Sequence, residues 1–484
     1  MTENNKKELG AFYTPQHTVD YIVSLLGDFN NNSKLLEPSG GDGIFVSTIL
    51  NKNLLKPNQI IVWDINPKTK KNINKLKIKN VIIKDTLLNT NLSDNSLFRK
   101  SVFTHIIGNP PYLNKQSSYI KQNKNKLKKI YKEIGANDTY AMFMYLGCKL
   151  LDNNGQFCFI ISDTFLTLGI HKKLRKFLLE NYQIRNITLC PSKLFKEMGA
   201  LVNTCIIFIE NKKPKNNTFI KINDCRNNKI GNYVGKNTKT NQLKFLDYPD
   251  YVFDFNGGSK ILEKLNGYKK MIDFLDGGLG MHTTNNKKYL AVIDYNGKKY
   301  GNNSVTNIIS YKKINGVSWH FYHKKGGNAK YYSPIEYAIK WDEKSKSNYK
   351  SYKKLMMFKE RQGFIISGIS SNLSARIAKN GALWESNKAM GFFPKEPKKY
   401  SPEFFIGLLN SDSYNKIIKL LNHTSSIQIR DIKKLPFFDF TKIDIVKITN
   451  FVKKIINNKR INLEYDSNNE QKKIDLIVSK YICS

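Results

Sequence analysis

The sequence predicts a doubly wound α/β domain followed by a second domain of mixed α+β structure. Between residues 34 and 209, short apolar runs alternate with amphipathic stretches, which is the pattern of stacked βαβ units. Past Lys212 this alternation gives way to polar, Asn/Lys-rich connections and scattered aromatic residues. The chain has 484 residues, more than one domain of about 150 residues needs. We therefore expect one domain at 1–245 and another at 246–484.

The elements of the first domain follow from the positions of the apolar runs. Helices are expected at 18–26, after Thr14-Pro15, and at 139–151, where Asp138 is a candidate N-cap. Seven strands are expected, at Lys34–Glu37, Ile60–Asp64, Val81–Lys84, His105–Gly108, Gln156–Ser162, Arg185–Leu189 and Thr204–Glu210. In the second domain, we expect helices at 402–421 and 443–456 and a glycine-rich loop at Gly277-Gly278.

Charge and composition narrow the classes of partner. Lysine and arginine total 79 against 39 acidic residues, and the net charge of +40 indicates a polyanionic partner. No apolar run approaches the roughly 20 residues that span a bilayer, and the first ten residues lack a secretory signal. The six cysteines have no zinc-type spacing, so no metal site is expected. We expect a monomer in the cytoplasm or, in a eukaryote, the nucleus, without a membrane contact.

A glycine-rich turn, Pro38-Ser39-Gly40-Gly41-Asp42-Gly43, follows the first predicted strand. Such a turn allows the backbone to approach a ligand closely, although it lacks the spacing of a pyrophosphate cradle. Asp64 ends the next strand, where an acidic side chain accepts hydrogen bonds from ribose hydroxyls. Together these features indicate a cofactor that contains adenosine.

The segment Gly108-Asn109-Pro110-Pro111-Tyr112 follows the apolar strand at His105–Ile107. Two consecutive prolines fix an extended backbone at the carboxyl edge of the sheet, where open α/β sheets bind ligands. The Asn109 side-chain oxygen and a neighbouring carbonyl suit an exocyclic NH₂ group, and Tyr112 offers a ring for stacking.

These motifs resemble a known family. Asn109-Pro110-Pro111-Tyr112, with Gly10-Ala11-Phe12-Tyr13-Thr14-Pro15 and Leu36-Glu37-Pro38-Ser39-Gly40-Gly41-Asp42-Gly43, resembles the motifs of gamma-class adenine-N6 DNA methyltransferases of the TaqI type. The resemblance covers residues 9–210, in the motif order of that class. It implies a Rossmann-like class I methyltransferase domain, S-adenosylmethionine as cofactor, and methylation of a flipped-out adenine in double-stranded DNA.

The resemblance also implies roles for individual residues. The carboxylate end of the cofactor would lie at Thr14 and the adjoining backbone, its amino group near Glu37 and Ser39, and its ribose at Asp64. Its adenine would pack against Ile65 and Phe143 and donate to Asp85, beside Thr86. The cofactor-binding residues are thus Tyr13, Thr14, Glu37, Ser39, Gly41, Asp64, Ile65, Asp85, Thr86, Asn109 and Phe143. The catalytic residues are Asn109, Pro110, Pro111 and Tyr112, with Phe195 stacking on the flipped base opposite Tyr112.

The rest of the chain is expected to bind DNA and to recognise its target sequence. Residues 425–436 resemble the segment that closes recognition domains of this family, so residues 246–484 would form a target recognition domain. A basic insertion at 121–132 follows the catalytic segment and is expected to contact phosphates. The candidate DNA-binding residues are Lys121, Lys124, Lys128, Arg361 and Arg376.

Three alternatives stay open at this point. RNA and protein-glutamine methyltransferases share the Asn-Pro-Pro-Tyr motif, although they usually lack a large recognition domain. Cytosine-N4 enzymes commonly carry Ser in place of the Asn. A DNA-specificity module with an inactive catalytic domain would have less reason to keep Asp64 and Asn109. No nuclease motif is evident, so any cognate endonuclease of a restriction-modification system is expected on a separate chain.

Overall fold

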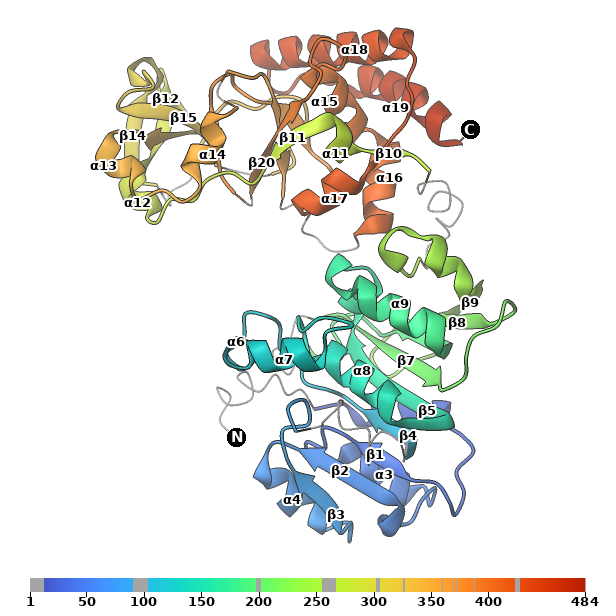
Figure 1. Cartoon of the computed structure of the whole chain (residues 1–484). Coiled ribbons are helices and arrows are strands. Elements are labelled where there is room, and N and C mark those ends of the chain that lie inside the picture. The colour runs from blue at the N-terminus through green and yellow to red at the C-terminus, as the bar shows by residue number, and fades with distance from the viewer. Residues whose placement is uncertain are drawn as a thin grey trace. The chain divides into compact units, whose positions relative to one another are not determined.

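The computed structural model describes residues 13–89, 103–196, 202–254 and 267–483, except 302–304, 325–326, 359, 369, 371, 387 and 423–426. The start of the first motif, Gly10 to Phe12, and Ser425-Ser426 therefore lie outside the described residues. The chain forms two compact units, Met1–Gly257 and Gly258–Ser484 (Figure 1).

The division between the units lies twelve residues beyond the expected boundary at 245/246. The reason is that residues 246–254 pack against the first unit. Phe253 N donates to Leu166 O at 2.9 Å, and the buried guanidinium of Arg175 donates to Asp250 O at 2.9 Å through Nη2. Long-range contacts of this kind leave no signal in the local pattern of apolar residues.

The first unit is built on a nine-stranded sheet in the order β3-β2-β1-β4-β5-β7-β6-β8-β9. Strands β1 to β5 pair in parallel, and β7 lies antiparallel between β5 and β6. The strands are β1 (Leu35–Glu37), β2 (Ile60–Asp64), β3 (Asn80–Ile83), β4 (Phe103–Gly108), β5 (Leu151–Ser162), β6 (Gln183–Leu189), β7 (Thr204–Glu210), β8 (Phe219–Asp224) and β9 (Lys236–Asn241). All seven predicted strands are present, and β8 and β9 extend the sheet.

Helices cover both faces of this sheet, as the α/β prediction requires. Successive strand residues point to opposite faces, so Cys158 and Ile160 pack in the core below α2 and α3, while Phe157 packs against Gly147 of α8. Helices α8 and α9 lie side by side (Figure 1), with Tyr145 against Phe177. The helices are α2 (Gln16–Leu25), α3 (Ile44–Asn51), α4 (Pro67–Asn74), α6 (Ser118–Gln122), α7 (Lys124–Ile130), α8 (Thr139–Leu150) and α9 (Lys172–Asn181).

The second unit combines two small sheets with a group of helices. One sheet has the order β11-β20-β17-β18, and the other has the order β13-β12-β16-β15-β19, with β14 paired to β12. The strands are β10 (Lys269–Lys270), β11 (Leu275–Gly278), β12 (Leu290–Tyr295), β13 (Lys298–Lys299), β14 (Asn307–Ser310), β15 (Trp319–His323), β16 (Tyr337–Lys340), β17 (Phe364–Ser367), β18 (Ala375–Ile377), β19 (Leu383–Trp384), β20 (Ala389–Pro394) and β21 (Pro436–Phe437). The helices are α11 (Met271–Phe274), α12 (Asn286–Tyr289), α13 (Glu343–Lys346), α14 (Tyr352–Met356), α15 (Pro402–Asn410), α16 (Asp412–Leu421), α17 (Ile429–Lys434), α18 (Lys442–Ile461) and α19 (Asn468–Cys483).

Three local expectations were wrong. The helix expected at 402–421 is two helices, because Ser411 leaves helical geometry and its side chain accepts from Tyr414 N to cap α16. Gly277-Gly278 is part of strand β11 rather than a loop, and a Cβ at Gly277 would lie 2.3 Å from Gly391 O of β20. The Asp138 side chain does not cap α8 but pairs with His171.

Membrane-spanning helices and metal sites were searched for among the described residues. None of the helices described there has the length and apolar character needed to span a bilayer. The described residues also contain no group of three His, Cys, Asp or Glu side chains that is arranged to hold a metal ion.

Candidate active site

A glycine turn brings β1 close to β2 at the carboxyl edge of the sheet. The chain leaves β1 at Glu37 and enters α3 at Ile44 through Pro38–Gly43. A Cβ at Gly40 would lie 2.3 Å from Val62 Cγ1, and Gly41 has a φ of +55°, so both positions favour glycine. The resulting turn places Gly41 N 2.7 Å from Asp64 Oδ2 at the end of β2.

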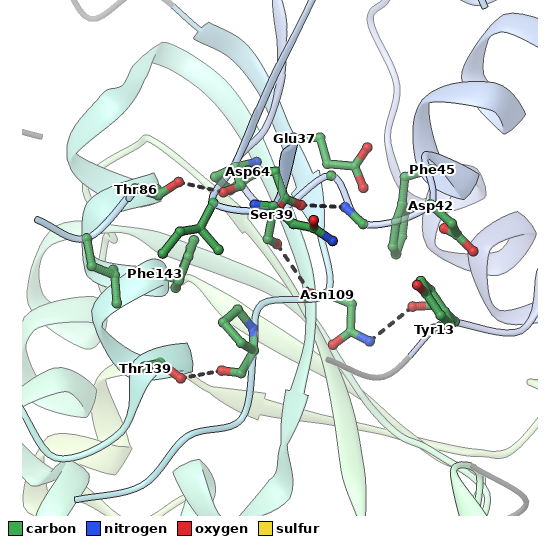
Figure 2. Close-up of a pocket in the computed structure, with 18 of the residues that line it drawn as sticks. Tyr13, Glu37, Ser39, Asp42, Phe45, Asp64, Thr86, Asn109, Thr139 and Phe143 are labelled. Atoms are coloured by element: carbon green, nitrogen blue, oxygen red, sulfur yellow. Dashed lines mark hydrogen bonds between the residues drawn. The ribbon is translucent and has the colours of Figure 1, made fainter. Parts of the chain in front are cut away.

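A pocket opens at this edge, above the ends of β1 to β4 (Figure 2). Its lining contains all the residues for which the resemblance implied cofactor binding: Tyr13, Thr14, Glu37, Ser39, Gly41, Asp64, Ile65, Asp85, Thr86, Asn109 and Phe143. The apolar part includes Phe45, Phe143 and the half-exposed Ile65, and the polar part includes several carboxylates. A pocket that combines aromatic and aliphatic walls with several polar groups suits a small organic ligand that carries both a ring and polar substituents.

Glu37 presents a buried carboxyl group to this pocket. Its side chain is 1% exposed, and among the described residues no hydrogen-bond partner is found for Oε2. Burial raises the pKa of Glu37 well above its usual value, and the nearby charges of Asp42 and Asp64 raise it further. An ammonium group in the pocket would offset this desolvation, so Glu37 fits the amino group of an amino-acid ligand.

Asp64 is shaped as an acceptor for hydroxyl groups. Its two carboxylate oxygens accept from Gly41 N and Asn66 N, both at 2.7 Å, which fixes the carboxylate against the glycine turn. Burial raises the pKa of Asp64, and the backbone donors oppose this shift. Each oxygen carries a second lone pair, so the pair of oxygens can also accept from two ribose hydroxyls.

Asp85 and Thr86, which follow β3, also line the pocket. Asp85 Oδ1 accepts from Leu87 N at 3.0 Å, and Thr86 Oγ1 donates to Pro38 O at 2.9 Å. The hydroxyl of Tyr119, in α6, lies 3.0 and 3.1 Å from the two oxygens of Asp85. Burial and the Asp85 charge raise the pKa of Tyr119, so its hydroxyl stays protonated and donates.

The Asn109 segment lines the pocket next to the glycine turn. Asn109 Nδ2 donates to Thr14 Oγ1 at 3.1 Å, and Ser39 Oγ donates to Asn109 O at 3.3 Å. The Thr139 hydroxyl donates to Pro111 O and accepts from Leu113 N, so α8 holds the backbone on both sides of Tyr112. The segment therefore faces the same cavity as the glycine turn, in a fixed conformation.

The structure does not bring Tyr112 and Phe195 together as two faces of a base site. The Tyr112 hydroxyl donates to Ile160 O at 3.2 Å, and its partly buried ring meets the edge of Tyr140. Phe195 is fully buried in the core with Cys190 and Ile206 and does not line the pocket. In this structure the Phe195 ring is therefore not available for stacking, because the core of the first unit covers it.

The candidate DNA-binding residues fall into two groups. Lys121, Lys124 and Lys128 are exposed on α6 and α7, as the expected phosphate contacts require. Arg361 is one-third exposed and donates to Asp276 Oδ2 at 2.8 Å. Arg376 is 3% exposed, and burial lowers its pKa to about 10, so the expectation that it contacts DNA is not met in this structure.

Several lining residues were missed by the sequence reasoning: Asp42, Phe45, Asn66, Leu87, Leu113, Tyr119 and Thr139. Most of them neighbour a predicted residue, and the turn position of Asp42 and Asn66 was a usable signal. Tyr119 had no such signal, because it is 34 residues from its partner Asp85 in the sequence.

Comparisons with known proteins agree with this geometry. Residues 43–195 match the family described as Eco57I restriction-modification methylase. The type II methyltransferase M.HincII of Haemophilus influenzae is 24% identical over 99% of this chain and 100% of its own length. M.HindII of H. influenzae is 29% identical over 44% of this chain, and the adenine-specific methyltransferase PglX of Lacticaseibacillus casei is 25% identical over 72%. These last two alignments span only 41% and 30% of the relatives.

Solved structures share the fold of this chain. The type IIL restriction-modification enzyme MmeI, in complex with DNA, matches 100% of this chain and 77% of its own with a TM-score of 0.64 at 13% identity. The DNA-bound type ISP enzyme LlaBIII matches 93% of this chain and 39% of its own with a TM-score of 0.56 at 13% identity. The first unit thus has the Rossmann-like fold of class I S-adenosylmethionine-dependent methyltransferases, and this chain is similar to restriction-modification methylases and type II methyltransferases.

Proposed function

We propose that this chain is a site-specific DNA methyltransferase that transfers a methyl group from S-adenosylmethionine to N6 of a flipped-out adenine. The observation that carries the proposal is that Glu37 and Asp64 line the same pocket as Asn109 and Pro111. A donor and an acceptor can therefore meet there. The relative named as an adenine-specific methyltransferase supports the choice of base.

The residues of the pocket fit the cofactor group by group. Glu37 would pair with its ammonium group, Asp64 with its ribose hydroxyls and Asp85 with its adenine amino group. The adenine ring would pack between Ile65 and Phe143. When bound, S-adenosylmethionine supplies an electrophilic sulfonium methyl group.

The Asn109 segment would activate the target nitrogen. The lone pair of adenine N6 is delocalised into the ring, so the nitrogen is a poor nucleophile. If the Asn109 amide oxygen and Pro110 O each accept one N–H, the amino group moves toward tetrahedral geometry and its lone pair is localised. Thr14 and Thr139 hold this segment in place, which supplies the orientation that direct transfer needs.

The methyl transfer needs no covalent enzyme intermediate. The N6–C bond forms as the S–C bond of the donor breaks, and the methylated nitrogen then loses one proton to water. The base must leave the duplex to reach the pocket, at a cost of a few kcal/mol. Stacking on Tyr112 offsets part of this cost, by roughly 1–3 kcal/mol.

The second unit and the basic insertion would supply DNA binding. The net charge of +40 favours a polyanion, and the match to DNA-bound MmeI extends over the whole chain. We therefore propose that residues 258–484 read the target sequence. The family match supports the role of modification enzyme in a restriction-modification system.

The proposal is tested by sequencing duplex DNA that was methylated by the purified chain. We expect N6-methyladenine within one sequence context. Asn109→Ala should lower kcat by about 10²–10³-fold, as loss of a polar group that stabilises a transition state does, with DNA affinity retained. Asn181→Ala, an exposed asparagine at the end of α9, is the control. Modified cytosine, modified RNA, or full activity of Asn109→Ala would contradict the proposal.

A further inference from the structure

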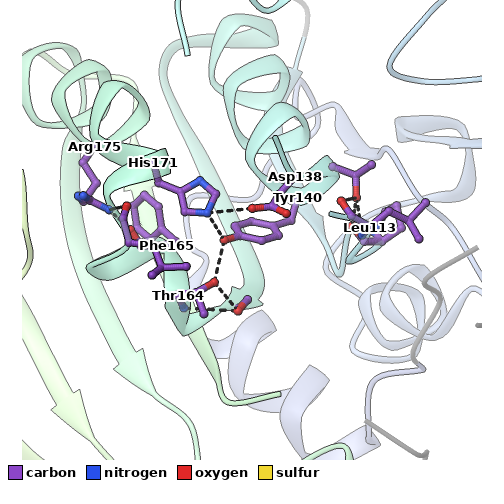
Figure 3. A network of polar contacts seen from close by, with 11 residues as sticks. Leu113, Asp138, Tyr140, Thr164, Phe165, His171 and Arg175 are labelled. Carbon is purple, nitrogen blue, oxygen red and sulfur yellow. Dashed lines mark hydrogen bonds and ion pairs between the residues drawn. The ribbon is translucent and has the colours of Figure 1, made fainter. Parts of the chain in front are cut away.

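Tyr140, Thr164, His171 and Asp138 form a largely buried polar network (Figure 3). This network adjoins Tyr112, because the ring of Tyr140 meets the Tyr112 ring edge-on, with centroids 6.0 Å apart and planes at 83°. The Tyr140 hydroxyl lies 2.8 Å from His171 Nε2 and 3.0 Å from Thr164 Oγ1. His171 Nε2 in turn lies 3.0 Å from Asp138 Oδ2.

The chemistry of these groups determines which of them donates each hydrogen bond of the network. An ionised carboxylate only accepts, so His171 Nε2 carries a hydrogen toward Asp138. A protonated Nε2 has no lone pair and only one hydrogen, so the Asp138 carboxylate and the Tyr140 oxygen share that hydrogen, and the Tyr140 hydroxyl donates to Thr164. Burial, followed by the charge of Asp138, raises the pKa of Tyr140, which keeps this hydroxyl protonated.

The side chains of this network belong to elements that also hold the backbone around Tyr112. Asp138 immediately precedes Thr139, which contacts Pro111 O and Leu113 N. Thr164 follows the end of β5, whose Ile160 O accepts from the Tyr112 hydroxyl. The turn before His171 is held by Arg175, which is fully buried and donates to Phe165 O and Leu168 O at 2.6 and 2.9 Å.

Stability alone gives a weak reason for this arrangement. A buried pair of ionisable groups loses much of its attraction to desolvation, and apolar residues of similar volume often serve as well. The arrangement does fix the rotamer of a tyrosine whose ring supports the side chain that would stack on the target base. The position of this network is thus better explained by a requirement for a fixed Tyr112 ring.

We propose that Asp138, His171 and Tyr140 are positioning residues that hold the Tyr112 ring in the orientation required for capture of the flipped base. This inference rests on the proposed function of the Asn109–Tyr112 segment. None of the three side chains needs to touch the cofactor or the base. Their effect passes through Tyr112, so it belongs to the step after DNA binding.

The test uses the full chain with Tyr140→Phe, which keeps the ring and removes the hydroxyl, and His171→Gln. We expect kcat to fall about ten- to a hundred-fold in each variant, as small misplacements near a reacting group cause. The KM for DNA and the Kd for cofactor should stay near their wild-type values. The double variant should be no slower than the slower single variant, because both act through one route. 2-Aminopurine at the target position should show a broader range of fluorescence lifetimes.

Tyr145→Phe is the matched control. It removes the hydroxyl of another buried tyrosine on α8, one that donates to Glu133 Oε2 at 2.8 Å and packs against Tyr131 and Phe177. Wild-type kcat in folded Tyr140→Phe and His171→Gln, or an equal loss in Tyr145→Phe, would overturn the inference. Absence of adenine methylation by the wild-type chain would instead overturn the proposed function.

Discussion

Single side chains in the pocket are arranged for a ligand rather than for the stability of the protein. Glu37 is the clearest case, because a carboxyl with 1% exposure and a raised pKa destabilises the chain without ligand. Asp42 and Asp64 lie close enough to raise that pKa further. Residues that oppose folding in this way are typical of functional sites.

Replacing Glu37 separates its effect on ligand binding from its effect on protein stability. Glu37→Gln should raise the Kd for S-adenosylmethionine by roughly ten- to a hundred-fold, because a charge-assisted hydrogen bond to the ammonium group is lost. Isothermal titration calorimetry measures this change. Glu180→Gln, exposed on α9, is the control, and an unchanged Kd for Glu37→Gln would contradict the assigned role.

Glu37→Gln also tests how the stability of the ligand-free protein depends on pH. The raised pKa means that folded Glu37 binds its proton more tightly than unfolded Glu37 does. Stability of the ligand-free protein should therefore decline as pH rises from the ordinary carboxyl range through the raised pKa. Glu37→Gln should reduce this decline in Tm, measured by calorimetry between acidic and neutral pH. Identical pH profiles for the variant and the wild type would count against a buried, titrating Glu37.

Tyr119 contributes a contact that the sequence did not reveal. Its hydroxyl donates to the Asp85 carboxylate, which is expected to bind the cofactor adenine. Tyr119→Phe should leave that carboxylate less well fixed and weaken cofactor binding by about three- to tenfold, the value of one modest hydrogen bond. Equilibrium dialysis measures this. Tyr131→Phe, which loses a bond to Leu87 O rather than to Asp85, should have the smaller effect; the reverse order would contradict the assignment.

At the scale of elements, helices α6 and α7 join a charged surface to the pocket. Their exposed lysines follow the Asn109 segment, while Ile120, Leu127 and Tyr131 are buried and anchor the helices. Tyr119 and Tyr131 bond to the loop after β3, at Asp85 and Leu87. The insertion is therefore an ordered part of the first unit with lysines presented to solvent.

The three candidate lysines of this insertion test its role. Lys121, Lys124 and Lys128 changed together to Gln should reduce the slope of log K against log salt by up to about 3, one unit for each lost phosphate contact. Fluorescence anisotropy over a salt series gives the slope. Gln at Lys68, Lys70 and Lys71, three exposed lysines of α4, provides an equal loss of charge. Equal slopes in the two triple variants would refute a specific contact.

For the whole molecule, all the residues that line the pocket belong to the first of two units with separate cores. Cofactor at a hundred times its Kd stabilises the state that binds it by about 2.7 kcal/mol. Hydrogen exchange should therefore slow within residues 13–254 and stay unchanged within 267–483. Equal protection of both units on cofactor binding would show that they unfold as one cooperative body.

The sequence by itself determined the layout of the first unit and the composition of its pocket. Apolar runs bounded by turns are local signals, so β2 and β7 were predicted to the residue. The carboxyl ends of parallel strands meet at one edge, so residues at the ends of β1, β2 and β4 had to lie together. This argument placed the glycine turn, Asp64 and Asn109 in one site, the family resemblance added Glu37, and all of them line one pocket.

Only the tertiary structure decided which side chains are buried and which partners they have. Phe195 and Arg376 were expected at the surface of a site and are buried. Asp138 was expected to cap α8 and instead pairs with His171, and Tyr119 bonds to Asp85, 34 residues away in the sequence. Burial and pairing of this kind depend on contacts between residues far apart in the chain, and local patterns of polarity do not encode those contacts.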